Sequence, residues 1–181
     1  MRIENHWLSH STRIPSPNCD ERPVTEDISL IVVHCISLPP EQFGGGYIDQ
    51  LFCNQLNPDQ HPYFKEIHQL QVSSHLLIKR TGEIVQYVPF NKRAWHAGIS
   101  EYKGREKCND FSIGIELEGS ETQAYTDKQY QQLALVSKAL LENYPSLSKE
   151  NIAGHSDIAP GRKTDPGESF NWQTLLSALE D

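Results

Sequence analysis

The sequence lacks any apolar run that approaches the roughly 18 residues of a membrane-spanning helix. It also lacks a recognisable secretory signal, because its start, MRIENHWLSHSTRIPSPNCDERP, has neither an apolar core nor a small-residue cleavage site. We therefore expect a protein that neither enters a membrane nor leaves the cytoplasm.

Cysteine is scarce, and its copies are widely spaced with no C-x-x-C pair. The four cysteines are Cys19, Cys35, Cys53 and Cys108. An even number allows disulfides, but a chain without a secretory signal favours reduced thiols. This favours a reducing cytoplasm as the location.

Positive charge is also in short supply. The chain has 16 Lys and Arg against 24 Asp and Glu, a net charge of -8, and its basic clusters, Lys79-Arg80 and Lys92-Arg93, are only pairs. Nucleic-acid binders need a basic face, so this class is excluded. With 37% hydrophobic and 22% charged residues, the 181 residues are typical of a soluble globular protein, and we expect one domain over 1–181.

Strand and helix patterns alternate along the chain. Residues 1–27, with three prolines, predict an extended N-terminal arm without helix. The β-branched run 28–36, ISLIVVHCI, predicts a central strand buried on both faces. Residues 72–90 predict a hairpin that turns at Thr81-Gly82. Residues 111–118, FSIGIELE, alternate as a strand does.

Helices are expected in four places. Segments 47–56 and 62–70 are weakly helical, whereas 126–144 begins with a capping-box pattern at Thr126 and Gln129 and ends before Pro145. A last helix, 171–180, should bury Trp172, Leu175, Leu176 and Leu179. Because the predicted hairpin is antiparallel, the pattern predicts a single α/β domain with a central mixed sheet flanked by helices.

Three groups of residues could carry chemistry. His34 ends the buried strand, where α/β folds place their sites, although a lone histidine there is more often a hydrogen-bonded core residue. Glu116 lies in the alternating strand; alone, the pattern favours a carboxylate that faces solvent, and bordering a cleft would make it a general base.

The third group lies in GHSDIAPGRKTDPG, residues 154–167, whose prolines and glycines predict a loop. It could be a polar surface loop in which Asp157 or Asp165 caps a helix. Alternatively, a hydrolytic zinc site needs about three His or carboxylate ligands, and His34, His155 and Asp165 would supply them at the strand ends and in this loop. Spacing alone does not select this set among eight histidines.

Two further histidines stand beside aromatic or apolar residues. In AWHAG, residues 94–98, Trp95 and His96 are candidate substrate contacts, although Trp95 could equally fill the core. His75, within VSSHLLI, is predicted to be structural rather than a fourth ligand.

Five stretches taken together are far more specific. These are SPNCDERP, ISLIVVHCISLPPEQFGGGYID, SSHLLIKRTGEIVQYVPFNKRAWHAG, CNDFSIGIELEG and GHSDIAPGRKTDPG, which span about residues 14–170. In these stretches the chain resembles the AmpD-type N-acetyl-anhydromuramyl-L-alanine amidases, within the wider amidase and peptidoglycan-recognition superfamily. A departure is Cys35, where members of the family usually carry Asn.

The resemblance implies a role for each candidate. His34, His155 and Asp165 match the ligands of a Zn²⁺ cofactor, Glu116 the carboxylate that activates the attacking water, and Lys163 the cation that stabilises the oxyanion. The family cleaves the amide between anhydro-N-acetylmuramic acid and L-alanine in cytoplasmic muropeptides, which recycles peptidoglycan and in some organisms lowers β-lactamase induction. We expect a monomer that acts on this small substrate.

Two other readings remain. A catalytically silent peptidoglycan-binding module of the same fold would tend to lose a zinc ligand, whereas all three ligand positions are intact here. A periplasmic paralogue that acts on the intact wall would need a signal peptide. We therefore favour the cytoplasmic amidase.

Overall fold

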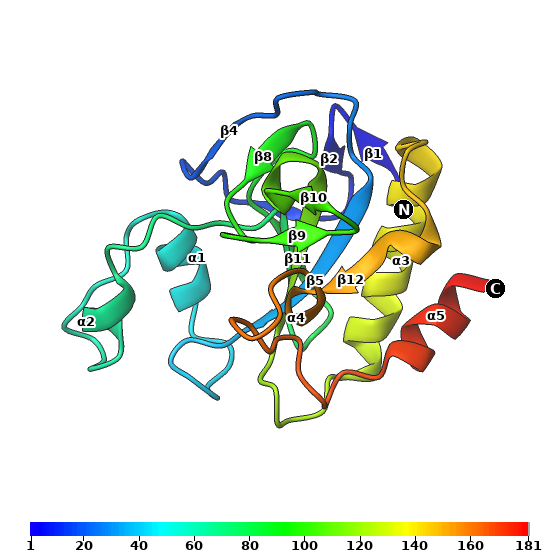
Figure 1. Ribbon diagram of the computed structural model, residues 1–181. Helices are drawn as coiled ribbons and strands as arrows, with labels where there is room; N and C mark the ends of the chain where they lie inside the picture. Colours follow the sequence, from blue (N-terminus) through cyan, green and yellow to red (C-terminus); the bar gives the residue numbers. More distant parts are fainter. Residues whose placement is uncertain (181) are drawn as a thin grey trace.

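A six-stranded mixed sheet forms the centre of the computed structural model, which describes residues 1–180 (Figure 1). Its strands lie in the order β12-β5-β11-β6-β7-β3. Their bounds are β3 Thr12–Arg13, β5 Leu30–Ile36, β6 Leu76–Ile78, β7 Ile84–Gln86, β11 Ser112–Glu118 and β12 Ile152–Gly154. In this sheet β6 and β7 pair antiparallel and the other pairs are parallel. The predicted mixed α/β class and the hairpin around Thr81-Gly82 are confirmed.

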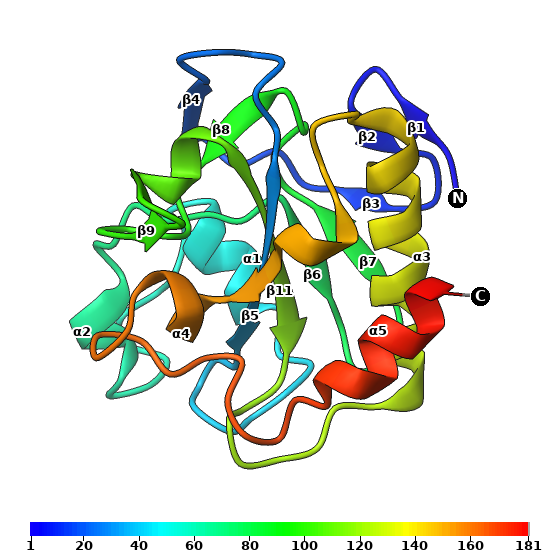
Figure 2. The ribbon, with the colours of Figure 1, turned by 45° about the vertical axis from the view of Figure 1, so that its right-hand side comes forward.

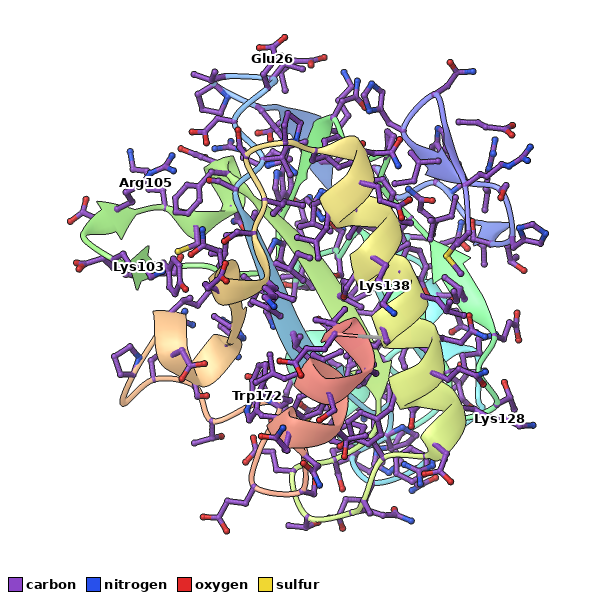
Figure 3. The ribbon with its side chains drawn as sticks, turned by 90° about the vertical axis from the view of Figure 1, so that its right-hand side faces the viewer. Glu26, Lys103, Arg105, Lys128, Lys138 and Trp172 are labelled. Carbon is purple, nitrogen blue, oxygen red and sulfur yellow. The ribbon has the colours of Figure 1, made fainter. Side chains whose placement is uncertain are left out.

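Helices cover both faces of the sheet. Helices α3 (Asp127–Asn143) and α5 (Trp172–Glu180) lie side by side over one face (Figures 2 and 3), and α1 (Tyr47–Phe52) and α2 (Phe64–Ile67) lie on the opposite side. Strand β6 shows the division, because Leu76 and Ile78 pack in the α3 cluster while Leu77 packs in the α1 cluster. Within the two segments predicted to be weakly helical, 47–56 and 62–70, only Tyr47–Phe52 and Phe64–Ile67 form α-helix.

Helix α3 begins at the predicted capping box. The Thr126 side chain accepts a hydrogen bond from Gln129 N, and Gln129 Oε1 accepts one from Thr126 N. The C-terminal helix differs from its prediction at one residue: Leu175 is buried, but Leu176 is 39% exposed and faces solvent. Helix α5 therefore packs on α3 with fewer apolar side chains than the four that the sequence pattern predicts to be buried.

Strands β5 and β11 position the site. They are parallel neighbours in register from Ser112 opposite Leu30 to Glu118 opposite Ile36, which sets Glu116 opposite His34. Ile31, Val33 and the odd-numbered residues of β11 pack towards α3. Because strand side chains alternate, His34 and Glu116 share the other face, at the carboxyl edge of the sheet.

The N-terminal 27 residues contain no helix but pair with the rest of the fold. Strands β1 (Ile3–Glu4) and β2 (Trp7–Leu8) form a hairpin, β3 adds to β7, and β4 (Cys19–Glu21) pairs with β8 (Lys92–Ala94). The Arg22 guanidinium is buried and donates to the carbonyls of Phe90, Asn109, Asp110 and Ser112. This segment is therefore built into the body of the protein.

The remaining elements are short. Strands β9 (Glu101–Tyr102) and β10 (Arg105–Glu106) form a surface hairpin, and 3₁₀ turns occupy Cys108–Asp110 and Lys149–Asn151. Helix α4, His155–Ile158, is one turn that follows β12 directly. The prediction of a loop throughout 154–167 is wrong at this turn. The Asp157 carboxylate accepts from Gly154 N at 2.7 Å, which caps the turn despite the helix-breaking residues beyond it.

The Glu118 carboxylate binds backbone N–H groups of two loops, so its removal should destabilise the fold. It is 5% exposed, and it accepts from Gly44 N at 2.5 Å and from Arg80 N at 3.1 Å. We expect Glu118→Ala to lower the free energy of unfolding by about 1–3 kcal/mol, because it removes two hydrogen bonds to a buried carboxylate and leaves part-buried N–H groups unpaired. Urea titration measures this, with the exposed Glu83→Ala as control. Equal losses in the two variants would contradict the assignment.

Candidate active site

Two histidines and one aspartate converge at the carboxyl edge of the sheet. The Nδ1 atoms of His34 and His155 lie 3.0 Å apart, and Asp165 Oδ2 lies 3.1 Å from His34 Nδ1 and 3.2 Å from His155 Nδ1. Both histidines are buried and Asp165 is half-buried. The structure thus brings together, as a possible metal-binding group, the three residues predicted as ligands.

Local folding explains how distant residues meet. Strand β12 lies parallel to β5, with Gly154 opposite Val33, so His155 follows beside His34. The chain returns through 159–165, and Ser156 N donates to Asp165 O at 2.9 Å. Gly154 permits this return, because a Cβ there would lie 2.9 Å from Pro166 Cδ. Gly154 and Pro166 of the motif therefore allow the two ends of the segment to approach closely.

The outer ring nitrogens of both histidines have partners. His155 Nε2 lies 3.2 Å from Ala97 O, a carbonyl that can only accept, so this nitrogen carries the proton. His34 Nε2 lies 2.9 Å from His96 Nδ1. When Nε2 carries the proton on His34 as well, two Nδ1 lone pairs face each other and a carboxylate. Such a donor set is repulsive without a cation, and two imidazoles with a carboxylate suit Zn²⁺.

The electrostatics match this donor set. Burial lowers the pKa of His34 to about 4, so its imidazole is neutral at neutral pH, the form that binds metals. For Asp165, burial acts to raise the pKa, but the neighbouring imidazoles of His155 and His34 outweigh it and hold the pKa well below its usual value. The group therefore offers the negative charge of Asp165 beside the neutral imidazole of His34.

Glu116 is buried beside these residues and is 8% exposed. Among residues 1–180 its Oε2 has no hydrogen-bond partner. Burial, and then the charge of Asp165, raise the pKa of Glu116 well above its usual value, while Lys163 acts to lower it. The expectation from alternation alone, that Glu116 faces solvent, is wrong, because this strand face lines a cleft between loops.

The cleft at this edge has a volume of about 510 Å³. Its lining includes the polar residues His34, Glu116, His155, Asp165 and the exposed Lys163. The apolar part of the lining, the apolar wall, consists of Leu51, Phe52, Tyr63, Ile67, Leu70, Val72 and Trp95. A ligand that fills the cleft would present an apolar surface to the apolar wall and a polar group to the polar residues.

The other residues that the sequence singled out differ in their surroundings. Trp95 is half-buried in the cleft wall, whereas His96 lines the cleft with both ring nitrogens engaged, by His34 and by Ser112 Oγ at 3.2 Å. His75 is structural as predicted, since its Nδ1 accepts from Gly114 N and its Nε2 contacts Lys92 O at 3.0 Å. Burial raises the pKa of the Cys35 thiol, beside the first ligand, to about 12, so it stays protonated.

Two contributors were missed by sequence reasoning. Asn109 Oδ1 accepts from His96 N and Ala97 N, and Arg162 Nη2 donates to Ala97 O and Ile99 O. Both residues lie within the sequence stretches that carry the family resemblance. Their spacing in those stretches, however, does not predict a chemical role for an asparagine or an arginine. Only the folded contacts reveal their place next to the site.

All four cysteines are free thiols, as the sequence predicts. Within residues 1–180, the helices are too short or too polar to cross a bilayer.

Comparison with known proteins gives consistent matches. The model of the N-acetylmuramoyl-L-alanine amidase family matches residues 24–168. The 1,6-anhydro-N-acetylmuramyl-L-alanine amidase AmpD of Escherichia coli strain K12 is 62% identical, over 95% of this chain and 93% of its own. A crystal structure of an AmpD derivative superposes with a TM-score of 0.96 at 59% identity, covering 99% of both chains.

A more distant relative was solved with a ligand. The Escherichia coli amidase AmiD, in complex with anhydro-N-acetylmuramic acid-L-Ala-D-gamma-Glu-L-Lys, has a TM-score of 0.61 at 29% identity, covering 97% of this chain and 65% of its own. A family model over most of the chain and a full-length relative above 60% identity agree with the fold. The chain belongs to the N-acetylmuramoyl-L-alanine amidase family, in its AmpD-type group.

Proposed function

We propose that this chain is a zinc-dependent amidase that cleaves the amide between anhydro-N-acetylmuramic acid and L-alanine in cytoplasmic muropeptides, a step of peptidoglycan recycling. The observation that carries the proposal is the convergence of His34, His155 and Asp165 beside the buried, unpaired carboxylate of Glu116. The names of its close relatives support the substrate.

The residues fit a catalytic zinc ion, because three ligands of this kind leave a position open to solvent or substrate. Bound here, Zn²⁺ would act as a Lewis acid on the amide carbonyl and would lower the pKa of water towards about 7. His34, His155 and Asp165 would hold it, and the Asp165 carboxylate would supply a negative charge that imidazole ligands do not.

Glu116 is the general base in this proposal. Its unpaired Oε2 is available to accept a proton from the water that attacks the amide carbon. The raised pKa of the buried carboxyl also makes its protonated form a competent acid, which passes the proton to the leaving nitrogen of alanine. One side chain thus moves the proton from nucleophile to leaving group.

Lys163 is the cation that stabilises the negative charge on the carbonyl oxygen in this proposal. It is exposed at the cleft wall, near enough that its charge acts on the pKa of Glu116. We expect Lys163→Met to lower kcat by about 10²–10³-fold, or about 3–4 kcal/mol, as loss of an oxyanion donor does elsewhere. Steady-state kinetics measures it, with Lys107→Met as control, and a change in KM alone would contradict this role.

The apolar wall is the proposed site for the sugar. Trp95 offers a ring face, and Leu70, 48% exposed, extends the same apolar surface. His96 was a second candidate contact, but both of its nitrogens are engaged, so we leave substrate contact to Trp95. The exposed end of the cleft would take the stem peptide.

The deciding experiment offers anhydromuramyl tripeptide and intact sacculus in parallel, and identifies the products by mass. Release of tripeptide from the small substrate alone supports the proposal. Cleavage of the sacculus instead would favour a wall-acting amidase, and binding without cleavage would favour the silent module. The intact residue set and the unpaired Glu116 argue against the module.

We further propose a monomeric, cytoplasmic protein in which residues 1–181 form one domain. The free thiols suit a reducing compartment. The pairing of β3 with β7 suits a single folding unit. Sedimentation tests whether the protein is a monomer, and cell fractionation tests its location. Unfolding of a chain that lacks residues 1–27 tests whether this segment and the remainder form one domain.

A further inference from the structure

One short segment contacts the outer nitrogens of both histidine ligands. His96 Nδ1 lies 2.9 Å from His34 Nε2, and the next residue, Ala97, presents its carbonyl 3.2 Å from His155 Nε2. Two consecutive residues therefore contact two imidazoles, one from strand β5 and one from the start of helix α4.

The His96 ring is fixed from both ends. Its Nε2 lies 3.2 Å from Ser112 Oγ, so Nε2–H donates to that hydroxyl when Nδ1 accepts from His34. Gly114 makes room for the ring, because a Cβ there would approach His96 Cγ to 2.6 Å. Any larger residue at position 114 of strand β11 would clash with the His96 ring.

The Ala97 carbonyl is fixed by Arg162. Arg162 Nη2 donates to Ala97 O at 2.7 Å and to Ile99 O at 2.6 Å. Gly98 lies between these carbonyls with φ +60°, a conformation that directs both towards one guanidinium. Ala97 O thereby accepts from Arg162 and from His155 together.

The Asn109 side chain binds the backbone N–H groups of the same two residues, His96 and Ala97. Its Oδ1 accepts from His96 N at 3.1 Å and from Ala97 N at 2.8 Å, and the buried Arg22 donates to Asn109 O at 3.2 Å. The segment is therefore held on three sides, and its carbonyl cannot rotate without breaking several hydrogen bonds.

We propose that His96 and Ala97, held by Arg162, form a positioning element that keeps both histidine ligands in the tautomer with Nδ1 unprotonated and facing Asp165. The proposal rests on the metal site proposed above. Partners of ligand histidines of this kind contribute about 10–100-fold to metal affinity, because they fix ring orientation and protonation. Arg162, which sequence reasoning left without a role, becomes a residue that acts through Ala97 on His155.

The test compares Arg162→Met with Arg162→Lys. Methionine keeps the length of the side chain without donors, whereas the lysine ammonium can still donate to a carbonyl. Competition with a chromogenic zinc chelator of known affinity should show zinc binding about 10-fold weaker in Arg162→Met and largely restored in Arg162→Lys. Arg105→Met is the matched control, because Arg105 is exposed on the β9–β10 hairpin (Figure 3). Its side chain donates to Asp27 and Ser29.

A second readout needs no metal. Long-range ¹H–¹⁵N spectra of the metal-free protein report which nitrogen of His155 is protonated. We expect Nε2–H in the wild type and a mixture with Nδ1–H in Arg162→Met. At the other contact, His96→Phe should weaken zinc binding about 10–100-fold, and His96→Gln, whose amide oxygen can accept from His34, should weaken it less.

The outcomes separate this inference from the proposed function. Tight zinc binding that is equal in wild type and Arg162→Met would overturn the positioning role while leaving the metal site intact. Failure of the wild type itself to bind zinc would overturn the metal site on which the inference rests. If His96→Phe does not fold, the exposed Arg162 still decides the question.

Discussion

Glu116→Gln is expected to lose about 10²–10⁴-fold in kcat while it still binds zinc, because the amide keeps the size of the side chain but cannot accept the proton of the attacking water. Turnover of anhydromuramyl tripeptide and metal content of the same preparation measure the two properties together. Glu118→Gln is the matched control, since it lies two residues along the same strand and binds loop N–H groups instead.

The same variant should be more stable than the wild type when metal is absent. Burial raises the pKa of Glu116, so the folded state binds this proton more tightly than the unfolded state. Its contribution to stability is then fully present below the unfolded pKa, about 4.3, and is lost as pH rises through the folded pKa. Glutamine does not titrate, so the variant avoids this loss.

Urea titration in chelator at several pH values measures the effect. The stability of Glu116→Gln relative to wild type should rise from pH 4 to pH 7, and groups shared by both proteins cancel in the difference. A variant that turns over at near wild-type rate would assign the base elsewhere. A stability difference that falls with pH would show that the carboxylate is favourably paired in the folded protein.

The central architecture followed from local patterns. The β-branched run of β5 predicts a strand buried on both faces, the alternation of β11 predicts a second strand, and the capping box at Thr126 predicts the start of α3. Each of these signals is contained within a few consecutive residues. They do not give the parallel register that sets Glu116 opposite His34, because that pairing joins segments about 80 residues apart.

The features that were missed depend on long-range contacts. Two-residue strands such as β3 carry no periodicity, and Thr12 pairs with Val85, a residue that is distant in the sequence. Alternation in β11 shows that two faces differ, but not that loops close over the face of Glu116. The roles of His96 and Arg162 require the positions of His34, Ala97 and His155 together, which no spacing in the sequence encodes.

Asp165→Asn is expected to weaken zinc binding by more than the roughly 100-fold that partners of ligands contribute, since it removes the only charged member of the donor set. Zinc that binds the folded state raises stability by about 2.7 kcal/mol at a concentration 100 times its Kd. The variant should therefore lose the zinc-dependent rise in melting temperature as well as activity.

Asp157→Asn is the control in the same motif. Asp157 is exposed, and its carboxylate caps α4 through Gly154 N, a role that asparagine fills equally well. It should keep zinc, activity and the melting-temperature rise. If Asp165→Asn instead binds zinc with wild-type affinity, the third ligand is another group. Loss in Asp165→Asn alone ties the metal to the carboxylate that the loop from 159 to 165 brings back to the two histidines, and so explains why a segment rich in proline and glycine carries catalytic charge.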